Sequence, residues 1–244
     1  SVFALIVSFG FTGVNSVLEC LDMRGYVPTL TFYMVAPAAV ALLVLLVGWA
    51  RIRCCTRSAT TLTALLEWAA PYLLQLLFLV YPQVTTIAFD AFSCYPFTDS
   101  QWLKADVSIQ CFTPQHNFAK ALAWVAITIY PLGLLMLNAT LLFLAREAIT
   151  TQRPTKLSRC IGFLHNEYEL YFFWWEIIEM LRRFVLVGMM VLAQGSMMQL
   201  ILGILTSAAF MLFQVQASPY KELTDDLLAS SATFTLVVMF TCAT

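Results

Sequence analysis

Charged residues are scarce in this sequence. Asp, Glu, Lys and Arg make up 11% of its 244 residues, whereas they make up about a quarter of an ordinary soluble domain. Hydrophobic residues reach 61%, which excludes a water-soluble monomer. The net charge of −1 also provides no basic surface for a nucleic acid, so we expect no nucleic-acid partner.

Glycine and cysteine are also limited. Nine Gly residues exclude a collagen-like chain, and seven Cys residues spread over the whole length exclude a small disulfide scaffold. His116 and His165 fall on opposite predicted sides of a membrane, and no nucleophile and base stand out as a pair. The sequence therefore predicts a protein that is not an enzyme, with no cofactor and no metal site.

Long runs without charge are the main positive feature. They lie between Arg24 and Arg51, Glu67 and Asp90, Lys120 and Arg146, and Arg183 and Lys221, and they contain 22 to 37 residues. About 20 residues of helix cross the hydrocarbon of a bilayer. The runs lack the alternation of barrel strands, and a helix satisfies its own backbone groups in lipid. We therefore predict an all-α fold, a polytopic transmembrane helical bundle.

About seven spans are predicted within a single transmembrane domain that covers residues 1–244. As one helix the run after Arg183 would be about 55 Å long, so it must turn, and Gln194-Gly195-Ser196 supplies the turn. Because the chain begins with Ser1 and ends inside an apolar run, we expect it to be a fragment of a longer protein. The predicted spans are residues 2–18, 28–50, 62–84, 118–145, 171–193, 197–216 and 227–244.

Basic residues predict the orientation of the bundle. Arg51, Arg53 and Arg57 follow the second span, and four basic residues lie between Arg146 and Arg159 after the fourth. Loops rich in Lys and Arg face the cytoplasm, so we predict that residues 90–117, with Lys104 as their one basic residue, face outward.

Two pairs of cysteines have different predicted roles. Cys94 and Cys111 lie in the outward segment, where thiols are usually oxidised, so they are a candidate disulfide; the alternative is two unpaired thiols. Cys54 and Cys55 lie just inside a span and are palmitoylation candidates. A zinc site there would need a second Cys or His pair nearby.

Aromatic residues crowd the start of the fifth span. Aromatic side chains favour the membrane interface, so we interpret this cluster as an interfacial aromatic belt on the cytoplasmic side. A short interfacial helix over residues 162–171 is predicted to lead into it. The belt residues are Tyr168, Tyr171, Phe172, Phe173, Trp174 and Trp175.

An intramembrane charge cluster follows, made of Glu176, Glu179, Arg182 and Arg183. Arg183 is about 12 Å deeper than Trp175 along a helix axis, where charges need partners. The spacing pairs Glu179 with either arginine, which leaves Glu176 and one guanidinium over. The cluster either ties this span to a neighbour or lines an ion pathway. If the aromatic residues lie deeper, the arginines instead extend toward the surface.

Several short motifs follow one another along the chain in a characteristic order. They are Leu79-Val80-Tyr81-Pro82-Gln83-Val84, Phe92-Ser93-Cys94, Ile129-Tyr130-Pro131-Leu132-Gly133, Gly162-Phe163-Leu164, Trp174-Trp175-Glu176, Arg182-Arg183 and Ser218-Pro219-Tyr220-Lys221. Together they resemble the TRP-like multi-pass C-terminal membrane domain of very large algal and protist surface proteins. That region is distantly similar to transient receptor potential and polycystin channels.

The resemblance implies an integral membrane protein of the plasma or ciliary membrane. It suggests a membrane anchor and interaction domain of a large surface protein, which couples an extracellular part to membrane lipids, to a polycystin-type channel or to further copies of itself. The alternative is a TRP-like cation channel subunit. Between the fifth and sixth spans, however, only Gln194, Gly195 and Ser196 are available, and a selectivity filter needs a longer re-entrant segment.

Overall fold

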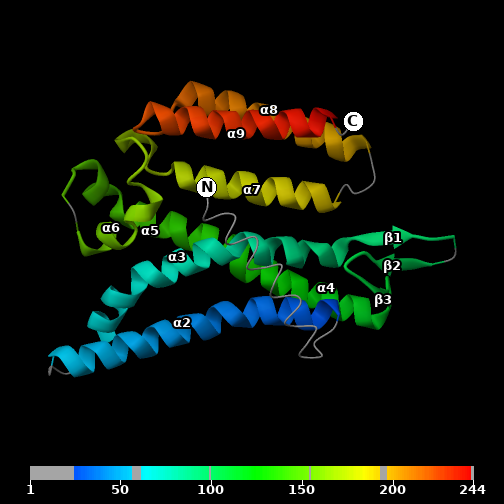
Figure 1. Ribbon diagram of the computed structural model, residues 1–244, viewed down its shortest axis with the longest axis horizontal. Helices are drawn as coiled ribbons and strands as arrows, with labels where there is room; N and C mark the ends of the chain where they lie inside the picture. Colours follow the sequence, from blue (N-terminus) through cyan, green and yellow to red (C-terminus); the bar gives the residue numbers. More distant parts are fainter. Residues whose placement is uncertain (1–24, 57–61, 99, 154, 193–196, 243–244) are drawn as a thin grey trace.

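Helices dominate the computed structural model, which describes residues 25–56, 62–98, 100–153, 155–192 and 197–242 (Figure 1). The predicted all-α class is confirmed in these ranges. The long helices are α2 (Tyr26–Thr56), α3 (Leu62–Phe89), α4 (Pro114–Ile127), α5 (Gly133–Thr150), α7 (Trp175–Leu192), α8 (Met197–Ala217) and α9 (Leu223–Cys242). The short helical elements are η1 (Asp90–Phe92), η2 (Thr128–Leu132), α6 (Lys156–Cys160), η3 (Gly162–Leu164) and η4 (Leu170–Phe172).

Five helical stretches in the described residues are long and apolar enough to cross a membrane. They correspond to the second, third, fourth, sixth and seventh predicted spans. The first predicted span, residues 2–18, lies outside the described residues. The fifth corresponds to α7, whose four charged residues set it apart from the others, so the count of seven is not confirmed. The five stretches are Tyr26–Arg53, Glu67–Asp90, Pro114–Thr150, Met197–Ala217 and Leu223–Cys242.

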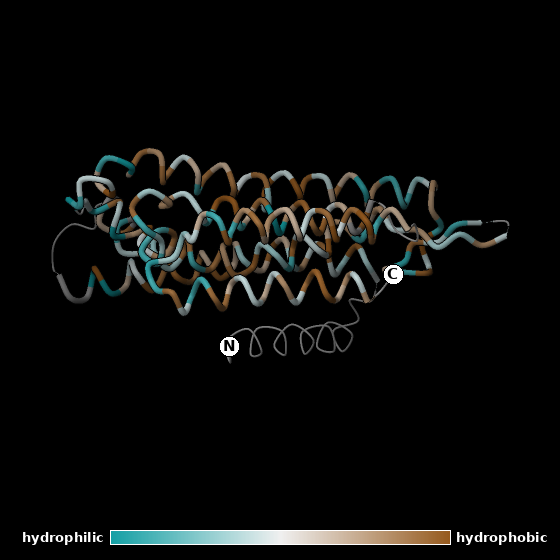
Figure 2. Tube along the Cα trace, turned by 90° about the horizontal axis from the view of Figure 1, so that it is seen from above, coloured by the Kyte–Doolittle hydropathy of each residue, from teal (hydrophilic) through white to brown (hydrophobic). Residues whose placement is uncertain are grey.

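The long helices lie side by side along the long axis of the molecule (Figure 1). Helix α7 packs against α3 and α5 on one side and against α8 on the other, whereas α9 packs against α8. Hydrophobic residues predominate along the middle of the helices, as Figure 2 shows, and many of them are exposed, such as Leu43, Phe143 and Met239. Such an apolar outer surface suits lipid better than water.

The fourth predicted span is interrupted by a π turn. Residues Thr128–Leu132 form η2 between α4 and α5, and Pro131 lies inside it. Proline has no backbone N–H and cannot continue the α-helical bonding pattern. The Gly133 N–H instead reaches the Thr128 carbonyl, five residues back. Pro131 therefore widens the helix locally, and the two helices continue as one long element.

The segment before α7 is not the continuous helix that the sequence predicted. Residues 162–171 contain η3 and part of η4, separated by non-helical residues that include an isolated bridge between Tyr168 and Tyr220. The bridge gives Tyr168 an extended backbone, which a helix would not allow. We call residues 161–174 the connecting segment.

A three-stranded antiparallel sheet occupies the segment that the sequence predicted only as a loop. It contains β1 (Cys94–Pro96), β2 (Gln101–Leu103) and β3 (Asp106–Gln110) in the order β1-β2-β3. The sheet and the C-terminal end of α2 lie at opposite ends of the bundle (Figure 1). We call residues 94–111 the disulfide hairpin. The structure thus separates the arginines of α2 from this hairpin, as the predicted orientation requires.

Candidate functional site

Two of the four charged residues of α7, Glu176 and Glu179, are buried in the structure, whereas Arg182 is half-buried and Arg183 is exposed. The Arg182 guanidinium donates two hydrogen bonds to one oxygen of Glu179, and the shorter of these is 2.5 Å. Glu179 is 5% exposed and Glu176 9%. Of the two predicted partners of Glu179, the structure therefore contains Arg182, three positions later. Both residues of this ion pair belong to α7, so the pair neutralises a buried carboxylate within one helix.

Glu176 receives a partner that sequence spacing did not reveal. The Tyr168 hydroxyl donates a hydrogen bond of 2.6 Å to the Glu176 carboxylate, and both groups are buried. Burial and the nearby Glu176 charge raise the pKa of Tyr168. Tyr168 therefore remains a hydrogen-bond donor at physiological pH. The sequence placed Tyr168 in the predicted interfacial aromatic belt, which gave its hydroxyl no partner within the protein.

Arg183, the second guanidinium, lies beside the Tyr81 hydroxyl of α3 and interacts electrostatically with Glu176. Tyr81 is 1% exposed, and its own hydroxyl donates to the Met180 carbonyl at 3.4 Å. The structure therefore brings all four charged residues of α7 into contact with other protein groups. Two of the partners, Tyr81 and Tyr168, come from outside α7.

The connecting segment also binds the turn between α8 and α9. The Glu169 N–H donates to the Pro219 carbonyl at 2.9 Å, and the Lys221 N–H donates to the Glu167 carbonyl at 3.0 Å. The rings of Tyr168 and Tyr220 have centroids 4.9 Å apart. We call these contacts, together with the Tyr168 bond to Glu176, the tyrosine joint. It ties the α8–α9 hairpin to the beginning of α7.

The predicted aromatic belt divides into two groups. Trp175 and Tyr168 are buried in the protein, and Trp175 stacks on Phe213 of α8 with centroids 5.1 Å apart. Tyr171 is 85% exposed. Phe172, Phe173 and Trp174 are half-buried. Trp175 and Tyr168 therefore serve internal packing. For Tyr171, Phe172, Phe173 and Trp174 an interfacial belt stays a prediction.

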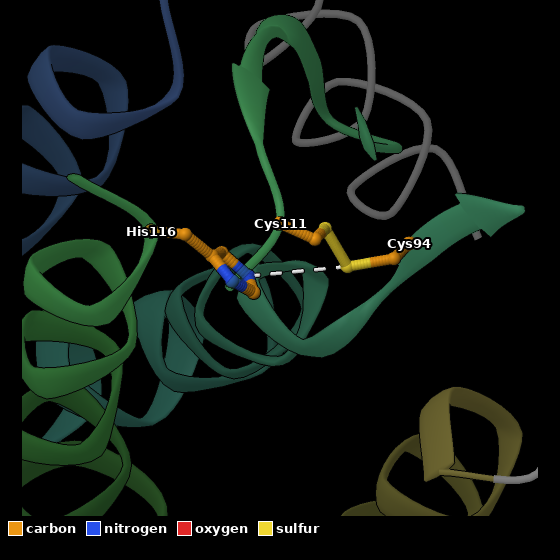
Figure 3. A group of neighbouring side chains, drawn as sticks. All are labelled: Cys94, Cys111 and His116. Carbon is orange, nitrogen blue, oxygen red and sulfur yellow. Dashed lines mark hydrogen bonds between the residues drawn. A yellow bond between two sulfur atoms is a disulfide. The ribbon is translucent and has the colours of Figure 1, made fainter. Parts of the chain in front are cut away.

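The disulfide hairpin contains the predicted cysteine pair. Cys94 and Cys111 are joined in a disulfide, with Cα atoms 6.6 Å apart (Figure 3). Asp106 on the same hairpin accepts a 2.8 Å hydrogen bond from the Tyr26 N–H at the start of α2. Partial burial disfavours the charged carboxylate, but hydrogen bonds from Ser108 and Tyr26 outweigh it and lower the pKa of Asp106. The hairpin therefore caps α2.

His116 lies next to the disulfide and completes a set of three possible metal donors. This set does not suit a metal as it stands, because both sulfurs are used in the disulfide. The His116 Nδ1 accepts the Phe112 N–H, which leaves the ring proton on Nε2 beside the Ala91 carbonyl. A histidine that binds metal through Nε2 normally donates from Nδ1 instead.

Cys54 and Cys55 lie in the last turn of α2, and their side chains are outside the described part of the chain. Palmitoylation there stays a prediction. No protein-family model matches this chain, and comparisons with curated proteins and with solved structures gave no match either.

Proposed function

We propose that this chain is a multi-pass membrane anchor and interaction domain of a large surface protein. In this proposal it holds an extracellular part in the plasma or ciliary membrane and couples it to lipids, to a polycystin-type channel or to further copies of the same chain. The basic loops face the cytoplasm and the disulfide hairpin faces outward.

One observation carries this proposal: two charged residues of α7 meet tyrosines from outside that helix. Glu176 accepts from Tyr168 of the connecting segment and Arg183 lies beside Tyr81 of α3, whereas Glu179 pairs with Arg182 within α7. An ion pathway instead needs charged or carbonyl groups that face a water-filled channel. Contacts within the bundle therefore favour a structural coupling role for this cluster.

Reconstitution of the purified full chain in planar bilayers tests the proposal. The anchor hypothesis predicts no unitary currents from the wild-type chain, Glu179→Gln or Arg183→Gln. Reproducible currents that change on either substitution would overturn it. Purification of the intact parent protein from its native membrane, with a separate channel subunit bound, is the positive result expected.

A cation channel subunit is the second candidate, and the placement of α9 favours it. Within the described residues α9 has few buried positions, and Ser231, Thr235 and Thr241 are exposed on it. A span with exposed hydroxyl groups can line a pore formed by several subunits. Cross-linking in native membranes separates the two candidates, because the channel hypothesis requires α9 to contact α9 of another copy.

A further inference from the structure

The side chain of His116 is enclosed where three segments of the chain meet. It is fully buried, and its Nδ1 lies 3.0 Å from the Phe112 nitrogen. Its Nε2 lies 3.0 Å from the Ala91 carbonyl oxygen and 4.0 Å from the Cys94 sulfur (Figure 3). The ring therefore joins η1, the first strand of the hairpin and the turn into α4.

The polarity of these contacts defines the protonation state of the ring. A backbone N–H can only donate, so Nδ1 must offer a lone pair to Phe112. The single ring proton then resides on Nε2 and is donated to Ala91. The contact with Phe112 requires a neutral imidazole, whereas the charged ring could still donate to Ala91. Phe112 itself has a φ of 65°, an unfavourable value for a residue with a side chain, and the bond to His116 helps to hold it there.

We propose that His116 is an acid-operated latch for the disulfide hairpin. A proton added at Nδ1 replaces the acceptor with a second donor, so the Phe112 N–H loses its partner and faces another N–H. The turn between β3 and α4 then separates from the ring, and the hairpin is released from the end of α4. The disulfide stays intact, so the hairpin moves as a closed loop.

The charged groups on the surrounding elements modulate this step. Lys120 lies one turn further along α4, above the Phe112 ring at 5.4 Å, and opposes the added proton. Asp90 on η1, Asp106 on β3 and Lys104 in the β2–β3 turn are the other charged residues of these elements. Asp106 is already occupied by Tyr26 and Ser108. The latch therefore responds to acid through His116 itself.

Hydrogen exchange of the full chain in lipid nanodiscs tests the latch. Burial lowers the pKa of His116 in the closed state. The protection of the Phe112 amide is therefore expected to fall as the pH drops below about 6.5, the ordinary histidine value. Opening that takes up one proton changes the opening equilibrium about tenfold per pH unit. Protection factors are compared after correction for the intrinsic pH dependence of exchange.

Two variants make the test specific. His116→Asn retains an oxygen that can accept from Phe112 and does not titrate, so its protection should be independent of pH. His165→Gln removes the other histidine, which lies in the connecting segment, and should retain the wild-type response. An equal loss of protection in wild type and His116→Asn would overturn the proposal.

Disulfide reduction gives a second measurement that needs no substitution at His116. A trialkylphosphine and one water convert the Cys94–Cys111 bond into two thiols, and the phosphine becomes its oxide. The latch predicts that the opening step in the reduction of the wild-type protein and of His165→Gln becomes about tenfold more favourable per pH unit below the ordinary histidine pKa, for as long as the closed ring stays neutral. A rate that follows only the pH dependence of the phosphine with an unfolded peptide, or constant wild-type protection, would refute the latch.

Discussion

Tyr168 has the most consequential single contact in the tyrosine joint. Its hydroxyl donates to a buried carboxylate from a segment outside α7, and its ring packs on Tyr220. An unpaired carboxylate in such a place would be costly, because little water is available to replace the lost donor. The hydroxyl is therefore more important than its position in an aromatic cluster suggests.

Tyr168→Phe is expected to lower the free energy of unfolding by about 2 kcal/mol, because a hydrogen bond to a charged group contributes roughly 1.5 to 3 kcal/mol. Thermal unfolding in detergent, followed by circular dichroism, measures the change. Tyr171→Phe is the matched control, since Tyr171 is 85% exposed and its substitution should change stability by less than about 0.5 kcal/mol. Equal effects of the two substitutions would contradict the role assigned to Tyr168.

Alkaline titration probes the same residue. Burial and Glu176 raise the pKa of Tyr168 above the ordinary tyrosine value of about 10. The native protein therefore holds this proton more tightly than the unfolded chain, and its stabilising contribution is lost as pH rises above the ordinary value. Ultraviolet difference spectra should show Tyr168 ionising only with unfolding. The absorbance change that accompanies unfolding should be smaller in Tyr168→Phe, and the difference is assigned to Tyr168.

At the scale of elements, the disulfide hairpin and α2 support each other. The Asp106 carboxylate binds the first N–H of α2, and Gly25 before it has a φ of 108°. A Cβ at Gly25 would lie 2.9 Å from the Asp106 carboxylate, so the close approach requires glycine. The start of a predicted span is thereby attached to a strand 80 residues further along the chain.

Replacing both Cys94 and Cys111 with Ser should lower stability by about 3 kcal/mol, the value expected for closing a loop of this length. Thermal unfolding under non-reducing conditions measures it. Cys160→Ser, at a free cysteine in α6, is the control and should leave the transition nearly unchanged. The same loss in both proteins would show that the loop closure is unimportant.

Asp106→Ala should destabilise the start of α2 by about 1 kcal/mol, the usual cost of losing a side chain that caps a helix. Because hydrogen bonds lower the pKa of Asp106 in the native state, its contribution is present above the ordinary carboxyl value and is lost as pH falls through the lowered one. Unfolding measured from neutral to acidic pH should show a smaller acid-induced loss in Asp106→Ala than in wild type. Identical profiles would exclude this cap as a source of stability.

Sequence reasoning predicted the helical class because composition decides it in lipid. Regular helical spacing offered both Arg182 and Arg183 as partners of Glu179, and the structure contains the first of these pairs. It did not predict the bond from Tyr168 to Glu176, since the extended backbone at Tyr168 depends on pairing with Tyr220. The strands of the hairpin were missed because β1 and β2 have three residues each, too short to show alternation.

For the whole molecule, the separation of the basic loops from the hairpin makes the orientation testable. Ser108→Cys on the hairpin should react with a membrane-impermeant maleimide added outside intact cells. Thr151→Cys, after α5, should react only after the cells are permeabilised. The parent chain without either substitution gives the background. Labelling of both positions from outside would reverse or abolish the proposed topology.

The π turn at Pro131 gives the long α4–α5 element an extra residue of phase. Removing a single residue there would restore ordinary α-helical bonding, so the side chains of α5 would keep their orientation relative to α4. Asn138, which donates to the Met180 sulfur of α7, would still face that helix. The same deletion within the regular part of α4 would instead rotate α5 by about 100° around its axis, so this element should tolerate a shortened chain better at η2 than within α4.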